Sequence, residues 1–136
     1  MPTKRYKGSC HCGKVKYEVD LDLSTGTGRC NCTYCAKVRN WSIGGKPAAF
    51  ALLSGESDLG DYNFRTDSTN HHHFCKHCGV RTHSRGYVKE IGGDYVSIAL
   101  STLDGVEARE LIEAPLRYMD GLHDNWFSTP VETRHL

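Results

Sequence analysis

Three short cysteine-containing segments decide how this chain folds: Cys10-His11-Cys12, Cys30-Asn31-Cys32-Thr33-Tyr34-Cys35 and Cys75-Lys76-His77-Cys78. They hold all seven cysteines of the 136 residues. We call Cys10 and Cys12 the first pair, Cys75 and Cys78 the second pair, and Cys30, Cys32 and Cys35 the triad. Four thiolates complete a tetrahedral zinc site, whereas three leave one coordination position free. The segments therefore predict one closed metal site and one open one.

Disulfides are the competing interpretation of these cysteines, and the sequence disfavours them. Seven is an odd number, so one thiol would remain unpaired. The first eight residues are polar and basic, without the apolar region of a signal peptide. No apolar run approaches the ~18 residues that span a bilayer. We expect a cytoplasmic, reducing environment without membrane contact, where clustered cysteines bind metal more often than they pair.

The local geometry of each segment suggests which cysteines share a metal. Residues i and i+2 of an extended backbone point to the same side, so the first pair aims both sulfurs at one point. The second pair surrounds a tight turn and is followed by Gly79, as in a zinc knuckle. A redox Cys-x-x-Cys usually opens a helix, whereas this one follows a histidine-rich run. The simplest of the possible partitions places both pairs on a structural zinc and the triad on a second zinc.

A histidine that closes the triad is the main alternative to an open site, because zinc sites with three cysteines and one histidine are common. Five histidines are candidates for this role: His71, His72, His73, His77 and His83. If the run before Cys75 is extended, His71 and His73 share its side and His72 faces away. Hydrogen bonding of these rings to metal-bound sulfur, or simple exposure to solvent, is the simpler explanation of the same run.

Alternating and apolar patterns predict a mainly β, single small domain over residues 1–136, with little helix. The expected strands are Lys14–Leu21, a buried one at Ala48–Leu53, Asp61–Arg65, Tyr95–Leu100 and Leu116–Met119. Helical turns are expected at Thr33–Val38 and Val106–Ile112. The formal net charge is +1, and seven thiolates with two Zn²⁺ ions would lower it by 3. The sequence therefore gives no basic signal for nucleic-acid binding.

These motifs resemble the glutathione-dependent formaldehyde-activating enzyme (GFA) family, which includes centromere protein V. The resemblance rests on Gly8–Gly13, Cys30–Cys35 and Phe74–Val80, with further similarity at Leu52–Glu56, Tyr62–Phe64 and Thr102–Gly105. It implies short antiparallel sheets packed as a β-tent around a structural zinc. It also implies a structural role for Cys10, Cys12, Cys75 and Cys78 and an active-site zinc at Cys30, Cys32 and Cys35.

The activity that the resemblance implies is that of a carbon–sulfur lyase, the reversible addition of glutathione to formaldehyde. The chemistry of the triad agrees with it. Zn²⁺ with three thiolates carries a net charge of −1, which suits a soft thiol as fourth ligand better than water. We therefore expect small thiols and aldehydes as partners, with Lys37, Arg39 and Lys46 as candidate contacts for glutathione carboxylates or as a solvated loop. The alternative is a non-catalytic, zinc-stabilised binding module whose second zinc is closed by histidine or absent.

Overall fold

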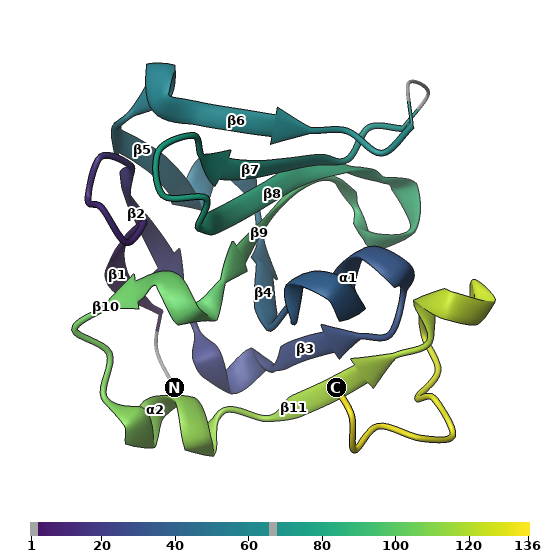
Figure 1. Cartoon of the computed structure of the whole chain (residues 1–136). Helices are drawn as coiled ribbons and strands as arrows, with labels where there is room; N and C mark the ends of the chain where they lie inside the picture. The colour runs from purple at the N-terminus through teal and green to yellow at the C-terminus, as the bar shows by residue number, and fades with distance from the viewer. Residues whose placement is uncertain (1–2, 66–67) are drawn as a thin grey trace.

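The computed structural model describes residues 3–65 and 68–136, and two β-sheets make up most of it (Figure 1). The smaller sheet has four strands in the order β10-β1-β2-β5. Its strands are β1 (Lys4–Ser9), β2 (Lys16–Leu21), β5 (Phe50–Ser54) and β10 (Leu103–Asp104). All of its strand pairs are antiparallel.

The larger sheet has seven strands in the order β11-β3-β4-β9-β8-β7-β6. Its strands are β3 (Thr27–Cys30), β4 (Ser42–Gly45), β6 (Leu59–Tyr62), β7 (His71–Cys75), β8 (Arg81–Val88), β9 (Gly93–Ala99) and β11 (Leu116–Met119). Only the pair of β11 and β3 is parallel among the described strands. This pair matters for function because β3 leads directly into the triad.

Helical structure is sparse and short. The two α-helices are α1 (Thr33–Val38) and α2 (Ala108–Glu113). Single 3₁₀ turns occupy Leu23–Thr25, Pro47–Ala49, Glu56–Asp58, Lys89–Ile91, Leu100–Thr102 and Gly121–His123. Figure 1 shows α1 on one side of the larger sheet, beside β4 and between β3 and β8. No helix in the described part of the chain is long and apolar enough to cross a membrane.

The apolar core lies between the two sheets, on the face of the larger sheet opposite α1. Tyr17, Ile98 and Leu100 are among its largest fully buried side chains. The Tyr17 hydroxyl shares a 2.6 Å hydrogen bond with Thr102, so its polar atom is satisfied inside the core. A separate buried cluster surrounds Cys10, Val15 and Cys75, where the two cysteine pairs meet.

The structure confirms a mainly β fold with little helix, and it corrects several details. The parallel pair of β11 and β3 departs from a purely antiparallel arrangement. The strand expected at Ala48–Leu53 begins at Phe50, because Pro47 opens a 3₁₀ turn, and it is only partly buried at the sheet edge. The strand expected at Asp61–Arg65 ends instead at Tyr62. That residues 1–136 form one domain stays a prediction.

The longest strand, β8, was not expected from the sequence. Its residues Arg-Thr-His-Ser-Arg-Gly-Tyr-Val show no apolar alternation. Thr82, His83 and Ser84 are nevertheless buried, because β8 lies between β7 and β9 and each polar side chain has a hydrogen-bond partner. A strand whose buried residues are polar gives no period-2 hydrophobic signal, so local patterning could not find it.

Candidate metal centres

The first and second pairs meet at one point, although about 65 positions separate them in sequence. The sulfur atoms of Cys10, Cys12, Cys75 and Cys78 all lie within 4.8 Å of one another. Cys12 Sγ is 3.6 Å from Cys10 Sγ and 3.6 Å from Cys75 Sγ. Cys10 and Cys75 are buried, whereas Cys12 is exposed. The structure therefore joins β1 and β7 through a compact group of four sulfurs.

Two similar backbone turns present these sulfurs. In the second, the Gly79 amide donates to the Cys75 carbonyl at 2.8 Å, and Gly79 has φ +76°, a conformation that favours glycine. The His77 amide donates to Cys75 Sγ at 3.4 Å, and in the first turn the Val15 amide donates to Cys10 Sγ at 3.3 Å. Amide donors of this kind stabilise thiolates rather than thiols. Hydrogen bonds from backbone amides, first that of Cys12, lower the pKa of Cys78 to about 6.

The spacing of the four sulfurs fits zinc. A tetrahedron with Zn–S bonds of about 2.3 Å has sulfurs about 3.8 Å apart, close to the 3.6 Å found here. A disulfide needs about 2.05 Å, and all seven cysteines are free thiols. The donor set consists of soft sulfur atoms alone, which excludes the hard cations Ca²⁺ and Mg²⁺. The assignment of these residues as zinc ligands stays a prediction that the geometry supports.

The triad is assembled where β3 ends and α1 begins. Cys30 is the last residue of β3, Cys32 is the N-cap of α1, and Cys35 lies within its first turn. Cys32 Sγ accepts from the Cys35 amide at 3.3 Å, and Cys30 Sγ accepts from the Cys32 amide at 3.4 Å. The three sulfurs lie within 4.8 Å of one another. A sulfur N-cap explains why so short a sequence, Thr33–Val38, becomes helical here.

The close approach of three thiols makes their ionisation strongly interdependent. Hydrogen bonds from Cys30 and Cys35 lower the pKa of Cys32 to about 2, whereas the pKa of Cys35 is raised, first through its bond with Cys30. The first thiolate therefore forms more readily than the other two. A cation is needed before all three can ionise together, and Zn²⁺ supplies the charge and softness for this set.

Aromatic and polar contacts hold the inner side of α1 against the larger sheet. Tyr34, which lies between two triad cysteines in sequence, stacks on His72 with ring centroids 3.9 Å apart. Arg81 lies over the Tyr34 ring at 5.6 Å and donates to Asn40 Oδ1 at 2.7 Å. Burial lowers the pKa of His72 to about 4, so its ring is neutral and packs as an aromatic side chain. His72 therefore supports the triad helix.

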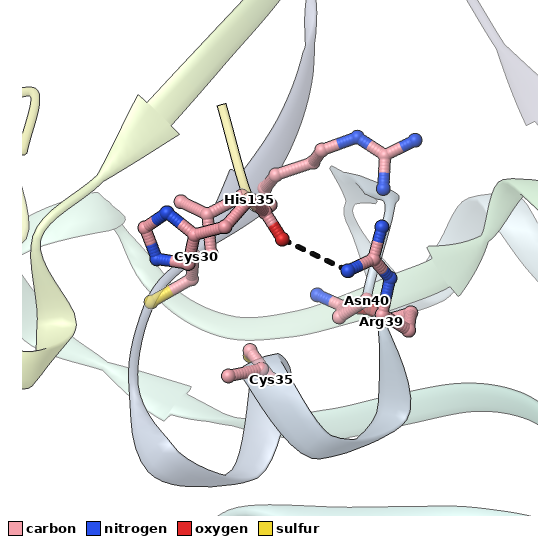
Figure 2. A pocket seen from close by; sticks show the side chains of 8 residues that line it. Cys30, Cys35, Arg39, Asn40 and His135 are labelled. Carbon is pink, nitrogen blue, oxygen red and sulfur yellow. Dashed lines mark hydrogen bonds between the residues drawn. The ribbon is translucent and has the colours of Figure 1, made fainter. Parts of the chain in front are cut away.

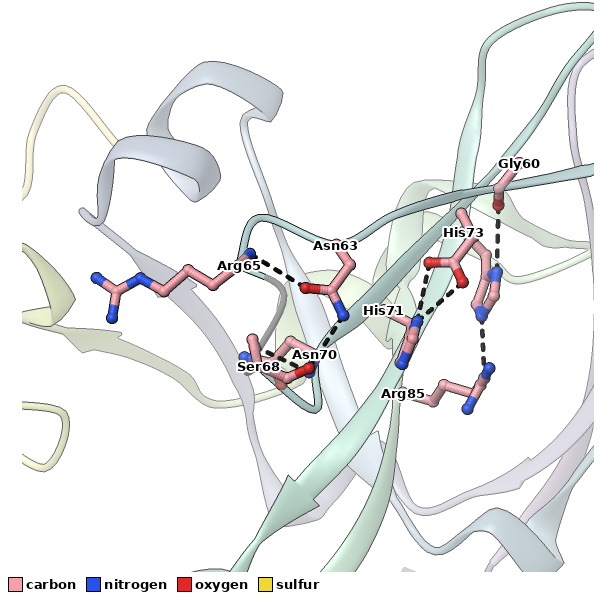
Figure 3. A network of polar contacts seen from close by, with 9 residues as sticks. Gly60, Asn63, Arg65, Ser68, Asn70, His71, His73 and Arg85 are labelled. Atoms are coloured by element: carbon pink, nitrogen blue, oxygen red, sulfur yellow. Dashed lines mark hydrogen bonds and ion pairs between the residues drawn. The ribbon is translucent and has the colours of Figure 1, made fainter.

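The other candidate histidines lie away from the triad. His71 and His73 project from the opposite face of β7, where His73 contacts the Gly60 carbonyl and Arg85 (Figure 3). His83 stacks on His73 on that same face. His77 lies beside the second pair and contacts Asp58 at 2.6 Å. None of the five histidines named from the sequence joins the group formed by the three triad sulfurs.

A small cavity opens beside the triad, and two of the triad residues, Cys30 and Cys35, line it (Figure 2). Its volume is about 120 Å³, and its lining comprises Arg29, Cys30, Cys35, Ala36, Arg39, Asn40, His135 and Leu136. Of the three cationic residues named from the sequence, Lys37, Arg39 and Lys46, only Arg39 lines this cavity. Lys46 instead reaches toward the Gly92 carbonyl, at 3.4 Å, and Lys37 is exposed in the last turn of α1.

Arg29 and His135 are cavity residues that sequence reasoning missed. Arg29 immediately precedes Cys30, and that adjacency was the one available signal. His135 is one hundred positions from Cys35 and reaches the cavity only through the path of the C-terminal segment. Trp126 and Phe127, in the same C-terminal part of the chain, are 45% and 82% exposed.

The C-terminal segment also anchors the triad loop. The Asn31 side chain, between Cys30 and Cys32, donates to Asp120 at 2.8 Å and accepts from the Leu122 amide at 2.9 Å. Gly121 lies so close that a Cβ atom there would stand 2.7 Å from Cys30 Sγ. Residues beyond β11 thus form a wall against the outer side of the triad.

Comparison with known proteins assigns this arrangement to a family. The family model of the glutathione-dependent formaldehyde-activating enzyme matches residues 5–115, which include both cysteine pairs and the triad. The crystal structure of a Rhodobacter sphaeroides protein is similar, with 31% sequence identity and a TM-score of 0.68. The similarity covers 81% of this chain and 98% of that one. This chain belongs to the glutathione-dependent formaldehyde-activating enzyme family.

Proposed function

We propose that the protein is a zinc-dependent carbon–sulfur lyase that forms and cleaves adducts of a small thiol with an aldehyde, with glutathione and formaldehyde as the first candidates. The observation that carries this proposal is that three sulfurs lie within 4.8 Å of one another beside a cavity lined by Cys30 and Cys35, and no fourth cysteine of the described residues joins them. Family membership supports glutathione-dependent formaldehyde activation as the reaction class.

The first and second pairs have a structural role in this proposal, and the triad has the catalytic one. A Zn²⁺ ion bound by the triad would supply a site that favours the thiolate form of a substrate thiol over the thiol. The substrate sulfur then adds to the aldehyde carbon, a C–S bond forms, and the carbonyl oxygen takes up a proton from solvent. The reverse reaction breaks that bond and returns aldehyde and thiol.

The protein's own residues contribute positioning and charge. Arg29 and Arg39 line the cavity and bring guanidinium groups to its edge, where carboxylates of a substrate such as glutathione would be attracted. Arg29 lies over the Trp41 ring, with its Cζ atom 5.0 Å from the ring centroid, and is thereby oriented. Holding thiolate and aldehyde together in one small site is the main source of acceleration in such an addition.

The size of the cavity sets what it can enclose. At about 120 Å³ it is somewhat smaller than the ~150 Å³ of an apolar cavity that holds one benzene molecule. It therefore suits the CH₂–SH end of a thiol with a one-carbon aldehyde. The rest of a tripeptide would lie on the open surface toward Arg39. We therefore expect the rate to fall as the aldehyde becomes larger.

A titration of the cobalt-substituted protein with glutathione tests thiol binding at the triad. We expect a saturable change in the charge-transfer and d–d bands at millimolar glutathione, because a fourth sulfur enters the coordination sphere. S-methylglutathione, which lacks the thiol, is the matched control and should cause no change. If both compounds leave the bands unaltered, the alternative of a non-catalytic binding module with a closed or vacant second site is favoured.

A further inference from the structure

The C-terminal residues 129–136 return to the triad although they are far from it in sequence. His135 and Leu136 line the same cavity as Cys30 and Cys35. The Arg39 guanidinium, just after α1, donates to the His135 carbonyl at 2.8 Å through Nη1 (Figure 2). Pro130 is buried, so the segment is held at its start as well as near its end. These contacts place the segment beside the cavity.

The His135 imidazole is directed toward Cys30. In Figure 2 its ring lies on the same side of the cavity as the Cys30 sulfur. Its residue is exposed, and within residues 3–65 and 68–136 the ring nitrogens have no hydrogen-bond partner. In contrast, His71, His72 and His77 all have ring partners in the fold. His135 is the histidine whose ring lines this cavity.

We propose that His135 is the resting fourth ligand of the metal at the triad, and that the substrate thiol displaces it. This inference rests on the proposed function, because it requires a metal at Cys30, Cys32 and Cys35. Three cysteines and one histidine form a common zinc ligand set, and a tethered imidazole has a high effective concentration at the open position. In the present structure the ring lies outside the 4.8 Å within which the sulfurs gather, so the tail must move inward to bind.

His135 lies outside the residues that the family model matches. The matched range ends at residue 115, and residues 116–136 contribute β11, the wall at Gly121 and the tail. A displaceable histidine would protect the triad from water and adventitious ligands while no thiol is present. It would also raise the thiol concentration needed to occupy the site, since the thiol must compete with the imidazole.

Cobalt spectroscopy of His135→Ala, with His71→Ala as matched control, tests this inference. Without thiol, we expect His135→Ala to alter the d–d bands of the cobalt protein and His71→Ala to leave them unchanged. With glutathione, the spectra of all three proteins should converge. If His135 occupies the metal nine-tenths of the time, its removal lowers the half-saturating glutathione concentration by about tenfold. Because His135 is exposed, the variant should fold normally, which circular dichroism verifies.

The outcomes separate this inference from the proposed function. Suppose that glutathione shifts the bands, but His135→Ala and the unmodified protein have the same spectrum without thiol and the same half-saturating glutathione concentration. His135 is then not the ligand, and the proposed function still stands. If no protein responds to glutathione, the proposed function fails first. Zinc X-ray absorption gives an independent measurement: the outer-shell imidazole scattering should be present in the unmodified protein, lost in His135→Ala and retained in His71→Ala. Equal scattering in all three would overturn the inference.

Discussion

The sulfur atoms of Cys12 and Cys75 lie 3.6 Å apart, although the two residues are 63 positions apart in sequence. Cys12 follows a strand of the smaller sheet, and Cys75 ends a strand of the larger one. Their meeting point is the buried cluster that also holds Val15. The two pairs therefore connect the sheets, whereas the triad involves only β3 and the adjacent helix α1.

Replacing a residue of the second pair should unfold the protein. Structural zinc in small domains contributes about 10–16 kcal/mol of binding free energy, comparable to the ~5–15 kcal/mol by which whole domains are stable. Cys75→Ser should therefore give an unfolded or molten chain with less metal. Circular dichroism and metal analysis of the purified protein measure both effects. A cooperatively folded Cys75→Ser protein with two metals would contradict the structural role of this site.

Replacing a triad residue should instead remove one of the two metal ions and leave the fold intact. Cys35 lies in a surface helix of six residues and links no distant strands. We expect Cys35→Ser to retain one zinc of two, keep its far-ultraviolet circular dichroism and lose the response to glutathione. Equal loss of structure in Cys35→Ser and Cys75→Ser would show that the division into structural and open sites is wrong.

A methyl group at position 121 should weaken the second metal site without unfolding the protein. A Cβ atom on Gly121 would lie 2.7 Å from Cys30 Sγ and 2.4 Å from the Trp126 ring. Trp126 is 45% exposed and can move, so the strain falls on the triad sulfur. We expect Gly121→Ala to lower metal affinity at the triad by about tenfold, or ~1.4 kcal/mol.

Competition with a chromophoric chelator measures this affinity. Gly44→Ala is the control, because a Cβ there meets only the Val96 carbonyl oxygen at 3.9 Å, an ordinary contact. The prediction fails if Gly121→Ala and Gly44→Ala release their metals at the same chelator concentration.

Stability should fall in mild acid because of His83. Burial lowers the pKa of His83 from 6.5 to about 3, so between these values the unfolded chain binds a proton that the folded chain does not. The contribution of His83 to stability is therefore complete above about pH 6.5 and decreases as pH falls toward 3. The slope of the unfolding free energy should reach about 1.4 kcal/mol per pH unit for this one group.

Denaturant unfolding of His83→Phe between pH 6.5 and 5 measures the share of His83 in this slope. A phenyl ring keeps the tilted aromatic contact with Phe50, whose ring centroid is 4.6 Å from that of His83. We expect a shallower pH dependence in His83→Phe than in the unmodified protein. Parallel slopes in the two proteins would exclude His83 as an acid-sensitive group.

Different features of the molecule were accessible to prediction from sequence for different physical reasons. Cysteine spacing is a local property, and it predicted the groups that the fold brings together at Cys10, Cys30 and Cys75. Strands with apolar alternation, such as Tyr95–Leu100, were likewise visible and agree with β9 (Gly93–Ala99). The family resemblance found in the motifs agrees with the match over residues 5–115.

Features that depend on distant contacts were not accessible. The interior strand β8 buries hydrogen-bonded polar residues and so carries no hydrophobic period. The parallel pairing of Met119 with Cys30 is decided by how the chain returns after α2. The same return brings His135 to the triad, whereas sequence proximity to the second pair suggested other histidines.

The most direct test of the central claim is the rate at which ¹³C-formaldehyde and glutathione exchange with their adduct, measured by magnetisation-transfer NMR at equilibrium. The zinc-loaded protein should raise this rate above the uncatalysed value in proportion to its concentration, and Cys35→Ser, which retains the structural metal, should not. A zinc-loaded protein with both sites filled that leaves the exchange rate at the uncatalysed value would contradict the proposed function.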